Sequence, residues 1–407
     1  MKILLLAPRV PTIRPDGLSL VLQHILPVFR ESCNLVLCGL EKTADSIPAT
    51  GSEQRGESWA YFASTLPVPR RLHHLSRTPI TLPCLYQGAD DWVDAILTRE
   101  RPEVAIVFGA SMGSLIAMMS RQVPTVYVPL DAAARHHSML AACTSGRVRL
   151  YQLFQAAKWR WYEPQVINYS SAAIYVSPMD AASVATRVRK GRLQVIPNGV
   201  DAAVFSRQAS EVKEYAVAIS GNFDYPPNVD GLLHFMNDIL PRSCRLSAEA
   251  RVLVLGKCSD PQVISRMAQI KSVTCVWNVD EMSTFIPRAR VFACPVRFGT
   301  GIRNNVLQAM ACGLPVITYP INVEALLPTG QSRCVIAESA GEFVDRMDRL
   351  LEKPDDELVN IGNCGRAYIL AQHDWRDIGN RYLNVLLGVA KGHVGGQDSA
   401  TKDEYRQ

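Results

Sequence analysis

Short, unbroken apolar segments recur along the chain, and each is followed by a polar loop and then by a segment with helical periodicity. A strand that is apolar at every position is buried on both faces, as in a parallel sheet covered by helices on its two sides. The alternation of such strands with helices predicts a doubly wound α/β fold. In the first half of the chain these segments are residues 3–6, 35–38, 104–108, 124–128 and 173–176.

The same alternation begins again after a turn, PNGVD at residues 197–201, and a polar stretch. Its apolar segments are residues 216–219, 252–255, 273–277, 291–293 and 315–318. We therefore predict two Rossmann-like domains, residues 1–200 and 201–375, which face each other across a cleft at the carboxyl ends of their strands. Residues 376–391 are predicted to form a last helix, and the polar residues 392–407 a disordered tail.

Composition narrows the class of protein. The chain has 407 residues, of which 48% are hydrophobic and 20% are charged, as in soluble globular proteins. A net charge of +5 is small for this length and does not indicate nucleic-acid binding. Eleven cysteines without a C-x-x-C pair predict reduced thiols in the cytoplasm. The sequence has no apolar run of about 18 residues, which a membrane-spanning helix needs, and its N-terminal apolar run is too short for a signal peptide.

The strongest candidate for chemistry is RFGTGIRNNVLQAMACGLPVITYP, residues 297–320, in which two glycines and an arginine precede a helix predicted at residues 304–312. Backbone N–H groups at a helix start, with the helix dipole behind them, favour a bound phosphate. Arg303 can add a charge-assisted hydrogen bond. Gln308, one turn inside the helix, is placed to reach ribose hydroxyls. The alternative is a purely structural turn with a solvated arginine.

Two further segments precede this loop: VIPNGVDAAVF at residues 195–205 and SGNFDYPPNVDGLLHFMNDILP at residues 220–241. Their order and spacing resemble the C-terminal domain of the retaining GT-B glycosyltransferases of family 4, and most of all the bacterial exopolysaccharide-type sugar transferases. The resemblance implies a GT-B fold in which the second domain binds a nucleotide-sugar donor and the first binds the acceptor. It also implies that the final helix crosses back to the first domain. No cofactor is implied apart from the nucleotide sugar as co-substrate, with a UDP-sugar favoured.

The resemblance also implies roles for individual residues. The diphosphate is expected on the glycine loop, the ribose on Gln308 and the base near Val279. Gly17 in the first domain is expected to face the donor phosphates. Asp131 is expected near the transferred sugar, and it forms with Arg303 the pair of candidate catalytic residues. The expected donor-binding residues are Gly17, Gly221, Asn222, Val279, Gly299, Thr300, Gly301, Ile302, Arg303, Asn305 and Gln308.

Three positions depart from the pattern of the family. Its paired glutamates would fall on Thr300 and Gln308, and its subgroup commonly has a lysine where this chain has Asn305. An amide holds hydroxyls less strongly than a carboxylate does, and the missing lysine removes a charge from the phosphate site. The chain is therefore an active transferase with an altered donor, a weak transferase, or a catalytically silent protein that binds a nucleotide or glycan or supports a partner enzyme. We favour the first, because the glycines and Arg303 are retained.

The chain contains no D-x-D motif, which argues against a metal-dependent transferase. The resemblance implies instead that the acceptor hydroxyl attacks on the face from which the diphosphate leaves, with retention of configuration and without a metal. Catalysis would then consist of positioning and of stabilising the leaving group. The acceptor is expected to be a glycan, a lipid-linked molecule or a small molecule, selected by loops at residues 43–77.

Two other motifs suggest different functions. GASMG, residues 109–113, is a G-x-S-x-G between a strand and a helix predicted at residues 114–119, so a serine hydrolase using Ser111 is a remote alternative. The segment RVRLYQLFQAAKWRWY, from Arg147 to Tyr162, is basic, aromatic and free of acids. Such a helix either binds the surface of an anionic membrane or packs its aromatic residues on the sheet. We thus expect a cytoplasmic protein, with peripheral contact at the inner face of the membrane in the first case.

Overall fold

The structure is a computed structural model that describes residues 1–9, 17–41, 59–61, 79, 88–206, 213–246, 251–279 and 281–392. Most of the loops at 43–77 and of the tail at 392–407 therefore lie outside the described residues. The chain forms two compact units. Unit 1 is Met1–Pro197 together with the segment that starts at Trp375, and unit 2 is Asn198–Asp374.

Unit 1 is built on a parallel sheet of seven strands in the order β3-β2-β1-β4-β5-β6-β7. In β1, Ile3 and Leu5 lie in one apolar layer while Leu4 and Leu6 lie in the other, because successive side chains of a strand point to opposite faces. Both layers are covered by helices, which explains the unbroken apolar runs in the sequence. The strands are β1 (Lys2–Arg9), β2 (Asn34–Glu41), β3 (Trp59–Tyr61), β4 (Val104–Phe108), β5 (Thr125–Leu130), β6 (Ala172–Tyr175) and β7 (Leu193–Val195).

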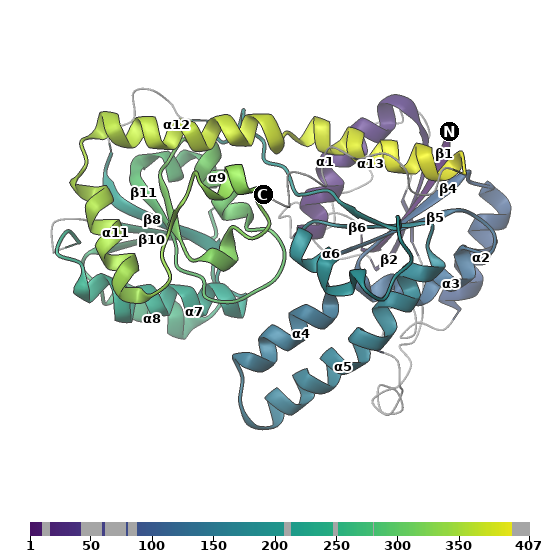
Figure 1. Cartoon of the computed structure of the whole chain (residues 1–407), viewed down its shortest axis with the longest axis horizontal. Coiled ribbons are helices and arrows are strands. Elements are labelled where there is room, and N and C mark those ends of the chain that lie inside the picture. Colours follow the sequence, from purple (N-terminus) through teal and green to yellow (C-terminus); the bar gives the residue numbers. More distant parts are fainter. Residues whose placement is uncertain are drawn as a thin grey trace. The chain divides into compact units, whose positions relative to one another are not determined.

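The helices of unit 1 divide between the two faces of its sheet (Figure 1). On one face, α1 (Gly17–Ser32) packs beside α13 (Trp375–Ala390), the last helix of the chain. The rings of His24 and Trp375 stack at 4.6 Å between centroids, which fixes the start of α13 on α1. The opposite face carries α2 (Ala89–Glu100), α3 (Ile116–Met119), α5 (Gly146–Tyr169) and α6 (Pro178–Ala185).

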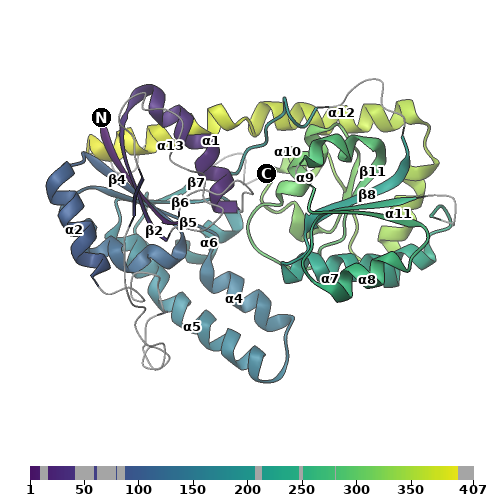
Figure 2. The same cartoon turned by 180° about the vertical axis from the view of Figure 1, so that it is seen from behind.

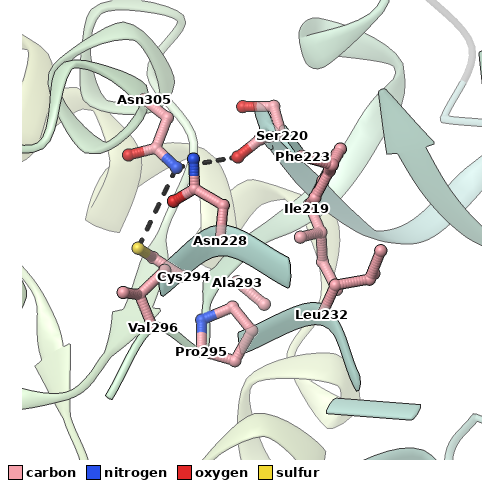
Figure 3. Close-up of a pocket in the computed structure, with 10 residues that line it drawn as sticks. All are labelled: Ile219, Ser220, Phe223, Asn228, Leu232, Ala293, Cys294, Pro295, Val296 and Asn305. Atoms are coloured by element: carbon pink, nitrogen blue, oxygen red, sulfur yellow. Dashed lines mark hydrogen bonds between the residues drawn. The ribbon is translucent and has the colours of Figure 1, made fainter. Parts of the chain in front are cut away.

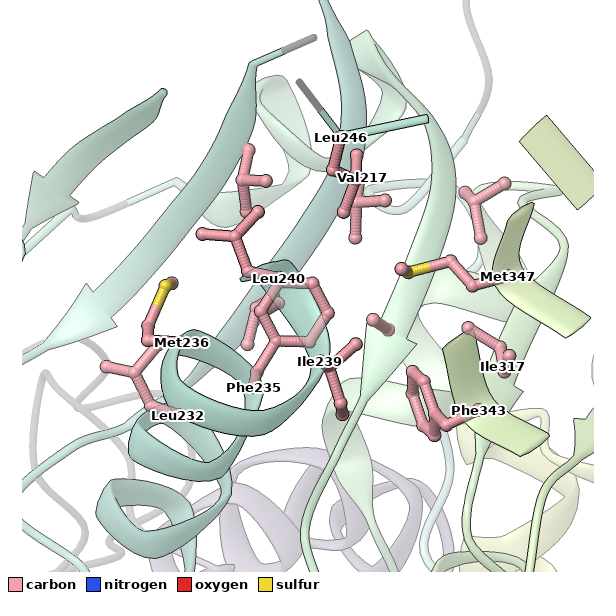
Figure 4. Packing of buried hydrophobic residues seen from close by; sticks show 14 of the residues in the cluster. Val217, Leu232, Phe235, Met236, Ile239, Leu240, Leu246, Ile317, Phe343 and Met347 are labelled. Atoms are coloured by element: carbon pink, nitrogen blue, oxygen red, sulfur yellow. The ribbon is translucent and has the colours of Figure 1, made fainter. Parts of the chain in front are cut away.

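Unit 2 repeats the plan with a parallel sheet of six strands in the order β10-β9-β8-β11-β12-β13. One face is covered by α7, α8 and α11, and Figure 4 shows Phe235, Phe343 and Met347 among the side chains of that core. The other face is covered by α9 and α12. The strands are β8 (Tyr215–Asn222), β9 (Val252–Lys257), β10 (Val273–Trp277), β11 (Ala289–Cys294), β12 (Val316–Thr318) and β13 (Val335–Ile336). The helices are α7 (Pro226–His234), α8 (Pro261–Ala268), α9 (Asn304–Ala311), α10 (Pro328–Gln331), α11 (Ala340–Glu352) and α12 (Asp355–Gln372).

The predicted two-sheet α/β architecture is confirmed, and every apolar segment predicted as a strand overlaps one, to within a residue at its ends. Strands β3, β7 and β13, all short and at sheet edges, were not predicted. Strand β7 is only half-buried along its length, so it lacks the apolar run by which the central strands were recognised. The ten cysteines within the described residues are free thiols. None of the helices described here is both long and apolar enough to cross a membrane.

A helical hairpin projects from unit 1 between β5 and β6, formed by α4 (Ala133–Ala142) and α5 (Figure 2). The buried carboxylate of Glu163 on α5 accepts hydrogen bonds from the backbone N–H of Ala133, at 3.2 Å, and of Ala134, at 3.5 Å. It also accepts one from the hydroxyl of Tyr175, at 2.9 Å. Glu163 thus supplies from a neighbouring helix the N-terminal cap that the sequence of α4 lacks. Burial raises the pKa of Glu163 to about 7.

Replacing Glu163 with glutamine is expected to flatten the pH dependence of stability between about pH 4.5 and pH 7. The pKa of the carboxyl is about 7 in the folded chain and 4.5 without the fold, so the native state binds this proton more tightly. Its stabilising effect is therefore full below about pH 4.5 and is lost as the pH rises through 7, by on the order of 3 kcal/mol. Urea unfolding across this range, with exposed Glu281→Gln as control, tests this. A slope that persists in Glu163→Gln would assign the pH dependence to another group.

Candidate functional site

The glycine loop lies between β11 and α9, at the carboxyl edge of the sheet of unit 2. Gly299 has a φ of +138° and Gly301 a φ of +74°, conformations that residues with a side chain rarely adopt. These two turns bring the chain to Arg303, the residue that precedes the first turn of α9 and does not cap it with its side chain. The start of the helix lies at the end of the sheet, because Asn305 in its first turn donates to the carbonyl oxygen of Ser220 in β8, and α/β folds bind ligands at this edge.

The side chain of Arg303 braces this loop from within. It is only 9% exposed, and its Nε donates to Oδ1 of Asn322 at 3.0 Å while Nη2 donates to the carbonyl oxygen of Phe298 at 3.0 Å. A Cβ added to Gly299 would lie 2.1 Å from Nη2, so the guanidinium fills the space that the glycine leaves open. Arg303 is thus not a solvated arginine, and its position depends on Gly299.

Asn322, which the sequence analysis did not single out, joins the loop to two strands. Its Nδ2 donates to the carbonyl oxygen of Val296 at 2.7 Å and to the hydroxyl oxygen of Thr318 at 3.0 Å. Thr318 in turn donates to the carbonyl oxygen of Cys294 at 2.9 Å. The ends of β11 and β12 are therefore tied together beneath Arg303 by buried polar groups whose bonds are satisfied. No local sequence pattern marks Asn322, since its partners lie far along the chain.

A small pocket lies beside the start of α9 (Figure 3). Asn305 donates from Nδ2 to the carbonyl oxygen of Ser220 at 2.8 Å, which joins α9 to the end of β8. The hydroxyl oxygen of Ser220 is buried, and among the described residues it has no hydrogen-bond partner. Because a buried polar atom without a partner is costly, this hydroxyl is a candidate contact for a ligand in the pocket. The pocket is lined by Ile219, Ser220, Phe223, Asn228, Leu232, Ala293, Cys294, Pro295, Val296 and Asn305.

The predicted donor residues of unit 2 collect around this edge of the sheet. Gly221 and Asn222 end β8 beside the pocket, and the carbonyl oxygen of Asn222 accepts a hydrogen bond from Asn228 at 2.9 Å. Gln308 lies one turn into α9 and is partly exposed. Val279 follows β10 and packs against the apolar cluster under α9, as does Ile302 of the loop. Thr300, between the two glycines, is buried.

Two of the predicted site residues, Gly17 and Asp131, belong to unit 1. Gly17 is the first residue of α1, and nothing lies within 4 Å of where its Cβ would be. Asp131 directly follows β5 and is half-buried. The residue before it, Leu130, has a φ of +73°, which is a genuine outlier for a branched side chain. The strain coincides with a shift in the register between β5 and β6, and the role of Asp131 stays a prediction.

The predicted nucleophile elbow at Ser111 differs from the expected geometry. The helix expected at residues 114–119 is instead a 3₁₀ segment, Ala110–Leu115, followed by the single turn of α3. The positive-φ residues other than glycine in the described part of the chain are Arg101, Leu130 and Asn278, so Ser111 lacks the strained backbone that exposes a hydrolase serine. A hydrolase serine also needs a histidine, and His373, which precedes an aspartate in the sequence, is buried in unit 2 and bonds through Nδ1 to the carbonyl oxygen of Asn198 at 2.7 Å. The geometry does not support a serine hydrolase.

Two family models match adjacent stretches of the chain. The model described as Glycosyltransferase Family 4 matches residues 51–204. The model described as Glycosyl transferases group 1 matches residues 214–353, which include the glycine loop and the pocket. The two matches thus fall one on each of the two halves predicted from the sequence.

Known proteins with similar sequence or structure agree with these matches. A GDP-mannose-dependent monoacylated alpha-(1-6)-phosphatidylinositol monomannoside mannosyltransferase of Corynebacterium glutamicum is 26% identical over 218 residues, a match that covers 47% of this chain and 55% of that protein. The chain therefore spans about half the length of this relative.

Among solved structures, sucrose-phosphate synthase from Thermosynechococcus elongatus superposes with a TM-score of 0.73 at 12% identity, covering 96% of this chain and all of that one. Anabaena HepE in complex with UDP and glucose gives a TM-score of 0.65 at 15% identity, covering 95% of this chain and all of that one. At such identities the likeness shows a shared fold alone.

Proposed function

The chain is a glycosyltransferase of family 4 with the GT-B fold, and from that premise we propose that it transfers a sugar, with retention of configuration, from a nucleotide-diphosphate sugar to an acceptor hydroxyl. The observation that carries the proposal is the glycine loop held open by the buried guanidinium of Arg303 at the start of α9. A loop of this form presents backbone N–H groups and a positive charge to an anion, which suits a departing diphosphate.

The proposed mechanism needs no carboxylate nucleophile. The acceptor hydroxyl attacks on the face from which the diphosphate leaves, and the leaving phosphate takes up its proton. The aligned N–H groups of α9 and the charge of Arg303 stabilise the leaving group, so catalysis consists of positioning and electrostatics. Asp131, beside the strained Leu130, is proposed to hold the transferred sugar. The absence of a D-x-D motif supports transfer without a metal.

A UDP-sugar is the proposed donor, held by the residues around the pocket. HepE, similar in fold, is described in complex with UDP and glucose, whereas the mannosyltransferase from Corynebacterium is named for GDP-mannose. Asn305 and Gln308 place neutral amides where the family commonly has a lysine and a glutamate. The amide of Asn305 is neutral and so brings no charge to the donor, and its Nδ2 already donates to the carbonyl oxygen of Ser220. We propose that these residues alter donor preference rather than abolish activity.

The proposed acceptor is a glycan, a lipid-linked molecule or a small molecule with a free hydroxyl. A cytoplasmic protein that meets the inner face of the membrane through the helix from Arg147 to Tyr162 would reach a lipid-linked acceptor directly. The mannosyltransferase relative is named for a phosphatidylinositol-based substrate, which supports the lipid-linked class.

A donor panel tests the proposal. The protein is incubated with UDP-, GDP- and dTDP-sugars, and thermal unfolding and slow donor hydrolysis are followed, because a ligand that binds the native state raises the unfolding temperature. We expect sugars of one nucleotide, UDP, to raise the unfolding temperature most and to be hydrolysed. The anomeric proton of the transferred sugar, read by NMR, then reports retention. Protection without turnover on any acceptor would favour the silent binding protein, and an absence of protection by every nucleotide would refute the proposed donor site.

A further inference from the structure

The helical hairpin of unit 1 has a tip that its own unit leaves uncovered, although its base is firmly packed. We call residues 143–154 the hairpin tip. Every residue from Ser145 to Tyr151 is exposed, whereas Trp159, Val166 and Ile167 on the second half of α5 are buried. Figures 1 and 2 both show the tip projecting away from the sheet of unit 1. The first half of α5 is therefore mostly exposed, whereas the second half is packed on one side and leaves Trp161 and Tyr169 exposed on the other.

The exposed half carries large apolar side chains over more than one side of the helix. At 100° of rotation per residue, positions 148, 150, 151, 153 and 154 cover an arc of about 220°, wider than the single stripe of an ordinary amphipathic helix. A protein groove covers one stripe of a helix, so it would leave several of these side chains in water. If the tip inserts into the interfacial region of a bilayer, lipid surrounds the helix and removes all of these side chains from water. The exposed fractions are Val148 54%, Leu150 68%, Tyr151 48%, Leu153 46% and Phe154 50%.

Charge identifies the kind of surface. Residues 132–162 contain no aspartate or glutamate but include five arginines and lysines. Arg135 is paired with the buried carboxylate of Asp180 at the hairpin base, at 3.2 Å. Arg147 and Arg149 lie instead on the exposed tip, interleaved with its apolar residues. Basic residues beside an apolar surface are attracted to anionic headgroups, which a neutral bilayer does not offer.

The hairpin is ordered before it meets any partner. Glu163 caps α4 at the base, and nearer the tip Nδ1 of His137 is 2.7 Å from Oε1 of Gln152 on the facing helix. Docking therefore requires little ordering of the backbone, which removes one of the main costs of association.

We propose that the hairpin tip docks the protein on a bilayer that contains anionic lipid. Leu150 and Leu153 enter the boundary between headgroups and acyl chains, while Arg147 and Arg149 bind lipid phosphates. The hairpin tip is thus the part of unit 1 that makes the membrane contact of the proposed function. Membrane binding itself does not depend on sugar transfer. Only its consequence, the delivery of a lipid-linked acceptor to unit 1, rests on the proposed function.

Sedimentation with lipid vesicles tests the inference without donor or acceptor. Equal parts of phosphatidylglycerol and phosphatidylcholine are compared with phosphatidylcholine alone, and we expect at least about tenfold tighter binding to the anionic vesicles, weakened by salt. The double variant Leu150→Glu with Leu153→Glu is expected to lose this binding. Its control, Leu370→Glu, alters a leucine on α12 that is 52% exposed and is expected to bind as the wild type does.

A charge-matched pair isolates the electrostatic part. Arg147→Glu with Arg149→Glu is expected to weaken binding at least about tenfold, whereas Arg121→Glu with Arg333→Glu, the same change of charge elsewhere, leaves it within about twofold. Equal binding by all variants, or none by the wild type, would overturn the inference. A dimer in light scattering that Leu150→Glu dissociates would overturn it too, since a second copy would then cover the tip. None of these outcomes bears on donor binding, which the nucleotide panel measures separately.

Discussion

Replacing Gly299 with alanine is expected to weaken binding of the nucleotide-diphosphate donor by about tenfold to a hundredfold, the loss that follows from one or two hydrogen bonds to a charged group. The new Cβ would lie 2.1 Å from Nη2 of Arg303, so the guanidinium must leave its place and its bond to the carbonyl oxygen of Phe298. The φ of +138° at Gly299 is also unfavourable for alanine, which adds strain to the loop. Isothermal titration calorimetry with the donor that the panel identifies measures the change.

The matched control for this variant lies in the same loop. Arg297 bonds Asp230 at the surface, with 2.6 Å between Nη2 and Oδ1, and exposed ion pairs contribute little. Arg297→Ala is therefore expected to keep donor affinity within about twofold. Urea unfolding of both variants shows whether the fold is intact, which we expect because the Cβ added at position 299 meets the end of a flexible side chain. Wild-type affinity in folded Gly299→Ala would mean that Arg303 does not shape a donor site.

Much of the architecture was predictable because it depends on local patterns of apolar and polar residues. Central strands buried on both faces are apolar at every position, so β1, β4, β8 and β9 were found from the sequence alone. The glycine loop was found for a similar reason: two glycines followed by a helix indicate a turn that only glycine adopts easily. The edge strand β7 carries no such pattern, since a half-buried segment of three residues resembles a loop.

The positions of the side chains in the candidate site depend on contacts between residues far apart in the sequence. A single sequence does not reveal these contacts. Arg303 was predicted as a partner of the diphosphate, but its bonds to Asn322 and Phe298 show that it also shapes the loop. The orphan hydroxyl of Ser220 is visible only when β8 and α9 are brought together. The G-x-S-x-G motif shows the opposite failure, because a matching local pattern at Ser111 lacks the backbone geometry that its function requires.

Gly362→Ala is expected to lower the free energy of unfolding by about 3 kcal/mol, the upper part of the usual range for overpacking a close contact. Gly362 lies in α12, and a Cβ there would be 1.8 Å from the carbonyl oxygen of Gly313, the residue after the end of α9. Gly313 has a φ of +67° and terminates α9, so this backbone has little freedom to retreat. Since α9 carries the glycine loop at its other end, the variant is also expected to weaken donor binding.

Gly365→Ala, one turn further along α12, provides a control of opposite sign. Its Cβ would meet only the side chain of Met310, with the nearest atom at 3.5 Å, which is ordinary van der Waals contact. Alanine is the better helix former, so this variant is expected to be neutral or to gain up to about 1 kcal/mol. Urea unfolding followed by circular dichroism compares the two. Equal stabilities would show that α12 tolerates a side chain at both positions, and that the approach of Gly362 to Gly313 does not hold α9 in place.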